Sequence, residues 1–276
     1  MKKGIRTIVY DEILKLEAYY FEGVVQSFPN HFHEYYVIGL IEEGERRLSC
    51  NSKEYVVSKG DILIFNPNDN HACLSNDQDD FNYRAINISK EIMLSLINDI
   101  TNKNELFVFS KNVIVNDEIS YYLKSLHEMI MNKTKDFIKE EYLLLMMSLL
   151  FKKYGQPFDY SIPEYRKEIE KACQFIQTHY FKQIHLKEIC QYCGISQSTL
   201  LRAFTKEKKM TPYRYLETIR INESKKLLEQ GVSPIETAIQ AGFSDQSHFT
   251  HYFNRFIGIT PGTYYSIFSK QRGNDK

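Results

Sequence analysis

Short runs of apolar and aromatic residues, separated by turn-forming residues, fill the first third of the chain. The clearest runs are Tyr35–Ile41, Glu54–Val57 and Ile62–Phe65, all rich in β-branched and aromatic residues. Glycine, asparagine and aspartate lie between them, as in Gly60-Asp61. Several short strands at close, regular spacing are typical of a small closed sheet. The pattern therefore predicts a β-barrel or sandwich over about residues 18–89.

Helical spacing of apolar residues then replaces the strand pattern. It predicts a helix over Ser89–Asn98, another that begins near Asn116-Asp117, and a third over Lys139–Lys153. The third helix is apolar on nearly every side, and such a helix must be covered all round. We expect it to pack against the preceding helix, the barrel or its own copy in a second subunit. Residues 116–154 are thus a predicted helical pair.

Turn-forming residues mark a break between two domains, and we expect the linker at Gly155-Gln156-Pro157 and Ser161-Ile162-Pro163. After it, a helix is predicted over Glu164–His179. Three to four further helices should follow, with breaks at Gly194, near Met210, at Gly231 and at Gly242. The sequence therefore predicts an α+β chain of two domains, 1–159 and 160–276, the second of them all-α.

Charge separates the same two halves. The 276 residues have no net charge, but residues 160–276 hold 17 Lys and Arg against 11 Asp and Glu, a net charge of +6. Residues 1–159 hold 18 against 24, a net charge of −6. The basic half is where binding to a polyanion such as DNA is expected. With 43% hydrophobic and 25% charged residues, the composition excludes a disordered chain.

Targeting and redox signals point to the cytoplasm. No early apolar stretch has the length of a signal-peptide core, and no window offers 18 uninterrupted apolar residues. An odd number of cysteines without a signal peptide fits reduced intracellular thiols. They are Cys50, Cys73, Cys173, Cys190 and Cys193. We expect a cytoplasmic protein without membrane contact.

An internal repeat dominates the second half. Segment Leu186–Leu216 aligns with Pro234–Tyr265. The pairs Cys190/Ala238 and Gly194/Gly242 match first, and after one inserted residue a second set of pairs follows. That set is Leu200/Phe249, Phe204/Phe253, Thr211-Pro212/Thr260-Pro261 and Tyr215/Tyr264. Two copies of a small residue, a glycine and buried aromatics at these spacings predict two helix-turn-helix units.

Each unit has the residues that this motif needs to end its first helix and to begin its second. Gly194 and Gly242 can take the positive φ that ends a first helix in a tight turn. Ser196 and Asp245 then stand at N-cap positions of a second helix. The stretch between the units, from Pro212 to Gln230, predicts one helix of roughly 28 Å. That length is close to one turn of DNA, about 34 Å, so the two units could enter successive major grooves.

The outward face of each second helix carries polar side chains that suit the reading of DNA. Glutamine can pair with adenine, and arginine with guanine or a phosphate. Residues about 168–268 resemble the DNA-binding domain of the AraC/XylS family, through the repeat residues and Arg220, Leu227-Leu228, Phe243 and Gly258. The resemblance and the polar faces together give the candidate DNA-binding residues. They are Gln197, Ser198, Leu201 and Arg202 in the first unit, and Gln246, Ser247 and His251 in the second. One departure is Lys209, where the family usually has glycine.

The first half is similar to a cupin barrel, the usual sensor of that family. His31-Phe32-His33-Glu34, Gly44, Gly60-Asp61 and His71 carry this resemblance. Cupins that bind a metal use two histidines, a glutamate and a third histidine, and Val37 stands where the glutamate is expected. Three histidines alone can hold zinc or iron, but the family resemblance favours an effector pocket without metal or cofactor. Its candidate residues are His33, Tyr36, His71, Cys73, Tyr83 and Arg84.

The resemblance implies a transcription regulator, not an enzyme, whose binding to double-stranded DNA answers to a small-molecule effector. We expect an activator that contacts RNA polymerase and forms a homodimer through the helical pair. One alternative is a metal-dependent cupin enzyme fused to a DNA-binding domain. Another treats the helical pair as a platform for a partner protein, with no small effector.

Overall fold

The computed structural model describes residues 4–75, 80–101, 103–115, 117–134, 138–157 and 165–272. The chain forms two compact units. The first comprises Met1–Phe28 and Phe32–Asp159, and the second comprises Tyr160–Lys276 with Pro29–His31. The expected two-domain α+β architecture is therefore present, with β-strands in the first half and helices alone within residues 165–272. Among these residues no helix is both long and apolar enough to cross a membrane.

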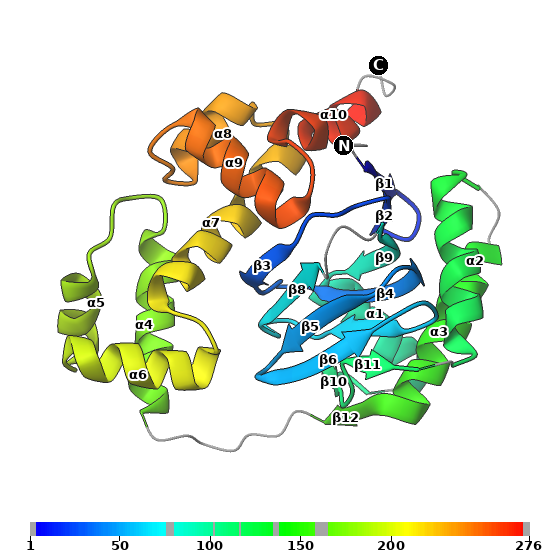
Figure 1. Cartoon of the computed structure of the whole chain (residues 1–276), viewed down its shortest axis with the longest axis horizontal. Helices are drawn as coiled ribbons and strands as arrows, with labels where there is room; N and C mark the ends of the chain where they lie inside the picture. Colours follow the sequence, from blue (N-terminus) through cyan, green and yellow to red (C-terminus); the bar gives the residue numbers. More distant parts are fainter. Residues whose placement is uncertain are drawn as a thin grey trace. The chain divides into compact units, whose positions relative to one another are not determined.

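Two antiparallel sheets make up most of the N-terminal unit (Figure 1). The larger has the order β1-β2-β9-β4-β7-β11. Its strands are β1 (Ile5–Asp11), β2 (Leu16–Glu22), β9 (Asn82–Ile88), β4 (Tyr36–Glu43), β7 (Ile62–Phe65) and β11 (Val113–Ile114). In the smaller, β5 (Arg46–Cys50) pairs with β6 (Lys53–Val57) and with β8 (His71–Ser75). Strand β3 (Phe28–His31) consists mostly of the residues 29–31 that belong to the second unit. The three clearest strand runs of the sequence are β4, β6 and β7, although the sheet already begins at Ile5.

Register decides which side chains face the helices. Ile38 of β4 pairs with Ile86 of β9 and with Ile64 of β7, and all three are fully buried in one hydrophobic core. Successive residues of a strand point to opposite faces, so Val37, Gly39 and Tyr83 lie on the other face of the same sheet. The helix-covered face is thus lined by aliphatic side chains, and the opposite face holds the barrel interior.

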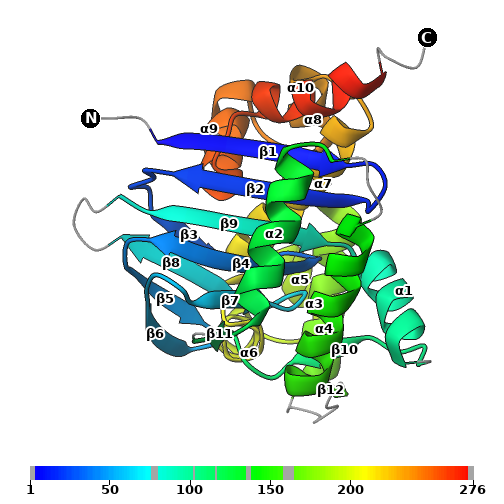
Figure 2. The same cartoon turned by 90° about the vertical axis from the view of Figure 1, so that its right-hand side faces the viewer.

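Three helices complete this unit: α1 (Lys90–Thr101), α2 (Ile119–Met131) and α3 (Ile138–Tyr154). Helices α2 and α3 pack against each other, and Figure 2 shows them lying across the larger sheet. Buried residues Leu143, Met146 and Leu150 join α3 to the core. Leu144 and Leu145 are 39% and 49% exposed. One face of α3 is therefore left uncovered by the described residues of the chain, and its covering by a second subunit stays a prediction.

The expected linker is also corrected in part. Gly155-Gln156-Pro157 forms strand β12, which pairs with β10 (Phe107–Phe109) through Phe109↔Gly155 and Phe107↔Pro157. A turn-rich tripeptide can be an edge strand when a distant partner supplies the hydrogen bonds, and sequence patterns do not show that partner. Ser161-Ile162-Pro163 lies outside the described residues.

The C-terminal unit is built from helices. They are α4 (Arg166–His179), α5 (Leu186–Cys193), α6 (Gln197–Lys208), α7 (Pro212–Glu229), α8 (Pro234–Gln240), α9 (Gln246–Ile257) and α10 (Pro261–Arg272). The breaks expected at Gly194, Met210, Gly231 and Gly242 each fall between two helices, which confirms them. Six helices follow α4 within residues 186–272, so three to four was too few. The repeat explains the difference, because each copy ends in a third helix that begins at Thr-Pro.

Candidate nucleic-acid interface and effector pocket

The first helix-turn-helix unit comprises α5 and α6. Gly194 ends α5 with φ +74°, and its N–H donates to the carbonyl of Cys190 at 2.9 Å. Ser196 then caps α6, where its hydroxyl accepts the N–H of Thr199 at 3.2 Å. Leu200 and Phe204 are fully buried. Both predicted roles, the left-handed glycine and the serine cap, are confirmed, and together they fix the angle at which α6 leaves the turn.

The second unit, α8 and α9, repeats this arrangement. Gly242 has φ +78°, and a Cβ there would lie 2.5 Å from the carbonyl oxygen of Tyr180. The close approach of two backbones therefore requires glycine as strongly as the turn does. A Cβ at Gly194 would meet nothing within 4 Å, so only its φ demands glycine. Asp245 accepts the N–H of His248 at 2.7 Å as the predicted cap of α9.

One helix of 18 residues, α7, joins the two units. Its length is about 27 Å at 1.5 Å per residue. Thr211 caps it and Pro212 occupies its first turn, where proline is well tolerated. The helix is buried at Leu216, Ile219 and Leu228 and contacts helices of both helix-turn-helix units. A rigid helix of this length can hold two recognition helices at a set separation.

The candidate DNA-binding side chains lie on the solvent-exposed faces of α6 and α9. Gln197, Leu201 and Arg202 are exposed on α6, and Leu201 is 39% exposed although apolar. On α9, Gln246, Ser247 and His251 are exposed. Ser198 belongs to α6, but its side chain lies outside what the structure describes. The structure therefore exposes the described candidate side chains of each unit to solvent on a single helix, as the sequence predicts. Their contacts with bases stay a prediction.

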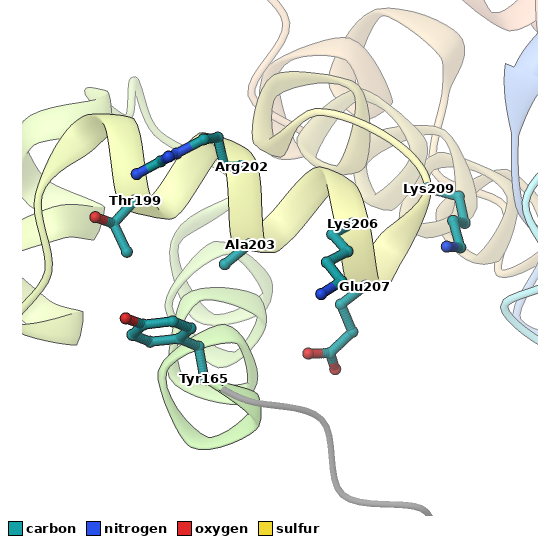
Figure 3. A pocket seen from close by; sticks show the side chains of 7 residues that line it. All are labelled: Tyr165, Thr199, Arg202, Ala203, Lys206, Glu207 and Lys209. Atoms are coloured by element: carbon teal, nitrogen blue, oxygen red, sulfur yellow. The ribbon is translucent and has the colours of Figure 1, made fainter.

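Arg202 also borders a hollow on the C-terminal unit of about 640 Å³ (Figure 3). Its lining is Tyr165, Thr199, Arg202, Ala203, Lys206, Glu207 and Lys209. Burial raises the pKa of the Glu207 carboxyl, and one of its oxygens is buried without a hydrogen-bond partner. Three cations surround this one acid, so the hollow is electropositive. The side chains of Arg202, Lys206 and Lys209, on α6 and at its end, are suited to contacts with DNA phosphates.

The barrel interior brings together four of the six candidate effector residues. The His71 ring stacks on Phe65 at 3.7 Å, and the centroid of the His33 ring lies 5.1 Å from that of His71. Burial lowers the pKa of His71 to about 4, so its imidazole is neutral at physiological pH. Burial likewise raises the pKa of the Cys73 thiol to about 11, and the charge of Arg46 opposes the shift.

Tyr83 faces the same interior and reaches across it. A Cβ at Gly39 would collide with the Tyr83 hydroxyl, so this glycine makes room for the phenol. Burial raises the pKa of Tyr83, and the neighbouring Cys73 adds to the shift. Tyr83 and Cys73 nevertheless keep some accessible surface. Side chains that are desolvated by protein and still partly accessible are what a sheltered pocket offers a ligand.

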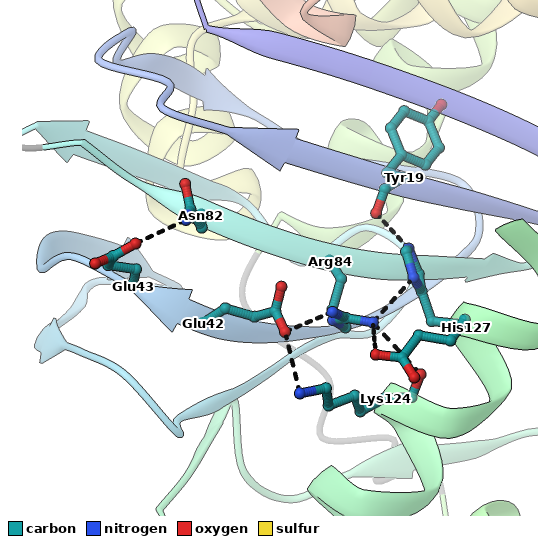
Figure 4. A network of polar contacts seen from close by, with 8 residues as sticks. Tyr19, Glu42, Glu43, Asn82, Arg84, Lys124 and His127 are labelled. Carbon is teal, nitrogen blue, oxygen red and sulfur yellow. Dashed lines mark hydrogen bonds and ion pairs between the residues drawn. The ribbon is translucent and has the colours of Figure 1, made fainter.

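Tyr36 and Arg84 do not face this interior, and the prediction that they do is wrong. Tyr36 belongs to the helix-covered core, and its hydroxyl donates to the carbonyl of Phe107 at 2.8 Å. Arg84 is one residue beyond Tyr83 on β9 and therefore points to the opposite face. There its guanidinium lies within hydrogen-bond distance of Glu42, Glu128 and His127 (Figure 4).

Arg46 is an interior residue that the sequence interpretation missed. It is 1% exposed, donates to the carbonyl of Val24 at 2.6 Å and lies over the Phe81 ring at 4.5 Å. The alternation of β5 could have revealed it, because Arg46, Leu48 and Cys50 are buried while Arg47 is exposed. A buried guanidinium that influences Cys73 belongs to the chemistry of the same interior.

Comparison with known proteins agrees with both halves. A helix-turn-helix domain matches residues 189–266, and an AraC-like ligand binding domain matches residues 14–147. The chain is 44% identical over 249 residues to an uncharacterized HTH-type transcriptional regulator, YbfI of Bacillus subtilis, and the matched region covers 90% of each chain. It is 22% identical over 271 residues to the transcriptional activator RhaS of Klebsiella pneumoniae, covering 94% of this chain and 92% of RhaS.

A solved structure has the same fold. The crystal structure of ToxT from Vibrio cholerae superimposes with a TM-score of 0.57 at 19% identity, over 92% of this chain and 98% of ToxT. A ligand-binding β-domain joined to a tandem helix-turn-helix domain defines a class of one-chain transcription regulators. The chain belongs to the AraC family of transcriptional regulators. The expected family, fold class and regulatory function are thereby confirmed, and the relatives found are regulators rather than enzymes.

Proposed function

We propose that α6 and α9 bind two successive major grooves of an operator, and that a small molecule in the barrel interior controls this binding. The observation that carries the proposal is the pair of equivalent helices, each capped and exposed in the same way, at the two ends of α7. Recognition helices enter major grooves with their N-terminal residues toward base edges. The candidate residues occupy the first half of each helix.

Binding to DNA is tested with the full chain. An operator is selected from random duplexes, and its affinity is measured from 50 to 200 mM salt. We expect a steep loss of affinity as salt rises, because each phosphate contact releases about one counterion. Binding that does not change with salt would contradict the role of the basic C-terminal unit. The variant Arg47→Ala serves as a control and should keep the affinity and salt dependence of the wild type, because Arg47 is an exposed arginine of β5 in the N-terminal unit.

Effector control is proposed for the interior formed by His33, His71, Cys73 and Tyr83. A screen of metabolites for a rise in melting temperature tests it, because a ligand that binds only the folded chain stabilises it. The hit should lose its effect in Tyr83→Ala and keep it in Tyr213→Ala. Tyr213 is a 60%-exposed tyrosine at the start of α7. If no metabolite shifts the melting temperature, a partner-protein platform becomes the better interpretation of the N-terminal unit.

A homodimer is proposed through the exposed apolar face of the helical pair. Leu145, Leu144 and Tyr121 are 49%, 39% and 61% exposed on adjacent helices. Contiguous apolar side chains of this kind mark interaction surfaces. Leu145→Glu should shift the sedimentation coefficient to that of a monomer. Val56→Glu, on β6, replaces a valine that is 65% exposed elsewhere in the unit and should not.

Activation in the cytoplasm through RNA polymerase completes the proposal. The relatives named RhaS are transcriptional activators, which supports activation here. Transcription in vitro from a promoter that carries the selected operator tests this step. Added protein should increase the number of transcripts, and a decrease would show a repressor instead.

A further inference from the structure

The two helix-turn-helix units differ along one face of their second helices. The alignment that pairs Phe204 with Phe253 places small or charged residues of α6 opposite aromatic residues of α9. The pairs are Thr199/His248, Ala203/Tyr252 and Glu207/Phe256. Since the buried positions of the two helices are apolar in both units, the difference concerns only this one face.

In the second unit, aromatic side chains of α9 fill the space beside α7. The rings of Tyr252 and Phe256 are stacked, with 6.4 Å between their centroids and an angle of 20°. The guanidinium of Arg214, on α7, lies 4.7 Å from the centre of the Phe256 ring. Tyr252 donates a hydrogen bond to the Glu217 carboxylate of α7, which raises the pKa of the phenol to about 12. The chain's own rings therefore complete this face.

The corresponding place in the first unit is the hollow of about 640 Å³ on α6. Figure 3 shows the Tyr165 ring across the hollow from Ala203, whose methyl group stands where the second unit has the Tyr252 ring. Tyr165 directly precedes α4 and is 43% exposed. Pockets for small organic ligands measure roughly 300–1,000 Å³. The hollow therefore has room for a ligand with a planar ring.

The charged side chains of the wall define what else this ligand must carry. Arg202, Lys206 and Lys209 supply three cations, which favour an anionic group such as phosphate. Glu207 Oε2 is buried without a hydrogen-bond partner, whereas Oε1 lies 3.8 Å from the Lys208 ammonium. A buried acceptor without a partner is costly. A donor on the ligand would remove this cost.

We propose that the hollow is a second ligand site, on the DNA-binding unit, and that it binds an adenine nucleotide. This class of molecule has all three required parts. The adenine ring stacks on Tyr165, as bases do on exposed aromatic side chains. Its exocyclic amino group donates to Glu207 Oε2, and the phosphate pairs with Lys206 and Lys209.

A nucleotide in the hollow competes with the operator for the same helix. Arg202 is a candidate base-reading residue, and Lys206 lies about one turn further along α6. Phosphate bound there withdraws cations from DNA, so the nucleotide weakens operator binding and the operator weakens nucleotide binding by the same factor. The site is separate from the effector pocket, which belongs to the N-terminal unit. Only the competition rests on the proposed DNA interface.

Calorimetric titration of the full chain with adenosine monophosphate (AMP) tests the site. We expect saturation at one AMP per chain. Purine riboside monophosphate, which lacks the amino group, should bind at least 10-fold more weakly, because the Glu207 oxygen then stays unpaired. Inorganic phosphate should bind more weakly still. Equal affinities for AMP and inorganic phosphate, or no saturable binding of AMP, would refute the site.

The variant Ala203→Tyr introduces into α6 the ring that α9 has at the equivalent position, and it changes no charge. It should weaken AMP binding by about 10-fold or more and keep the operator affinity of the wild type. Thr205→Tyr is the matched control, because Thr205 is exposed on the same helix but does not line the hollow. It should keep wild-type AMP affinity. Equal losses in both variants would mean that AMP binds only through the charge of α6.

A second variant keeps the test decisive if Ala203→Tyr does not fold. Tyr165→Asn removes the stacking ring, and asparagine tolerates the φ of +64° found at this residue. It should weaken AMP binding at least 5-fold, the lower end of what loss of an aromatic partner costs a stacked base. Unchanged AMP affinity, with an unchanged circular-dichroism spectrum, would exclude Tyr165 and with it the proposed binding mode.

Operator binding by the same preparations, with and without AMP, separates this site from the proposed function. A chain that binds its operator but no AMP refutes the second site and leaves the regulator intact. A chain that binds AMP but no DNA refutes the proposed DNA interface and leaves the nucleotide site standing. Operator affinity that AMP does not change would refute the competition.

Discussion

Arg84 of β9 and Glu42 of β4 form an ion pair, with 2.5 Å between Nη2 and Oε1, on the face of the larger sheet that α2 covers. The Arg84 side chain is only 7% exposed and that of Glu42 is 18% exposed. Arg84 also lies 3.4 Å from the carboxylate of Glu128 on α2. Its neighbour Tyr83 faces the barrel interior. Strand β9 therefore carries, at consecutive positions, one side chain that faces the barrel interior and one that contacts α2. A displacement of β9 at the pocket would therefore also move the contact with the helical pair.

Arg84→Met should lower the free energy of unfolding of the N-terminal unit by about 2–4 kcal/mol, because Glu42 loses the partner that compensates its partial burial. Urea denaturation of the full chain, followed by far-UV circular dichroism, measures the change. Lys124→Ala is the control. Lys124 lies 3.9 Å from the same Glu42 carboxylate but is 54% exposed, so its removal should cost less than about 1 kcal/mol. Equal losses would show that burial of Arg84 is unimportant.

His127 should make stability depend on pH in the weakly acidic range. Its Nε2 lies 2.7 Å from the carbonyl oxygen of Tyr19, and burial lowers its pKa to about 4, a shift to which Arg84 adds. In the unfolded chain the pKa is near 6.5, so between pH 6.5 and 4 the unfolded state binds a proton that the folded state does not. Stability is therefore fully present above about pH 6.5 and falls by about 3 kcal/mol toward pH 4.

Replacement of His127 by glutamine separates its contribution from that of His71, which has a similarly lowered pKa. Glutamine keeps a donor for the Tyr19 carbonyl but does not titrate. The loss of stability from pH 6.5 to 4.5, measured by urea denaturation with a chelator present, should be clearly smaller in His127→Gln than in the wild type. The same slope in both proteins would mean that His127 is protonated in the folded state.

The parts of the fold that local residue chemistry determines could be predicted from the sequence. Gly194, Gly242, Ser196 and Asp245 have the conformations and caps expected of them, because a left-handed turn or an N-cap admits few residue types. Alternation along β9 shows that Tyr83 and Arg84 cannot both face the interior, but local chemistry does not show which of them does, nor which way Tyr36 faces. A shift of one residue in strand register exchanges the two faces of a sheet, and the register depends on pairing between distant strands. Strand β12 was missed for the same reason.

Lys209 should be replaceable by glycine with a gain in stability. It ends α6 with φ +57°, the position that Gly258 fills at the end of α9 with φ +91°. The left-handed conformation is unfavourable for a residue with a Cβ, so Lys209→Gly should raise the free energy of unfolding of the C-terminal unit by about 0.5–1 kcal/mol. Thermal unfolding measures the gain. Lys209→Ala removes the same charge without relief of the backbone and should show no gain, while Gly258→Ala should destabilise.

Arg202→Ala should weaken binding to the selected operator by about 1–3 kcal/mol if the guanidinium contacts a guanine. Arg202 is exposed on α6 beside Leu201, an apolar side chain that can contact only a thymine methyl group. Affinities for the operator and for single base-pair variants, measured at one salt concentration, decide the role. A guanine contact predicts that one base-pair substitution costs the wild type much more than it costs Arg202→Ala. Weakening that is the same for every sequence, with a salt dependence reduced by about one counterion, would instead place Arg202 on a phosphate.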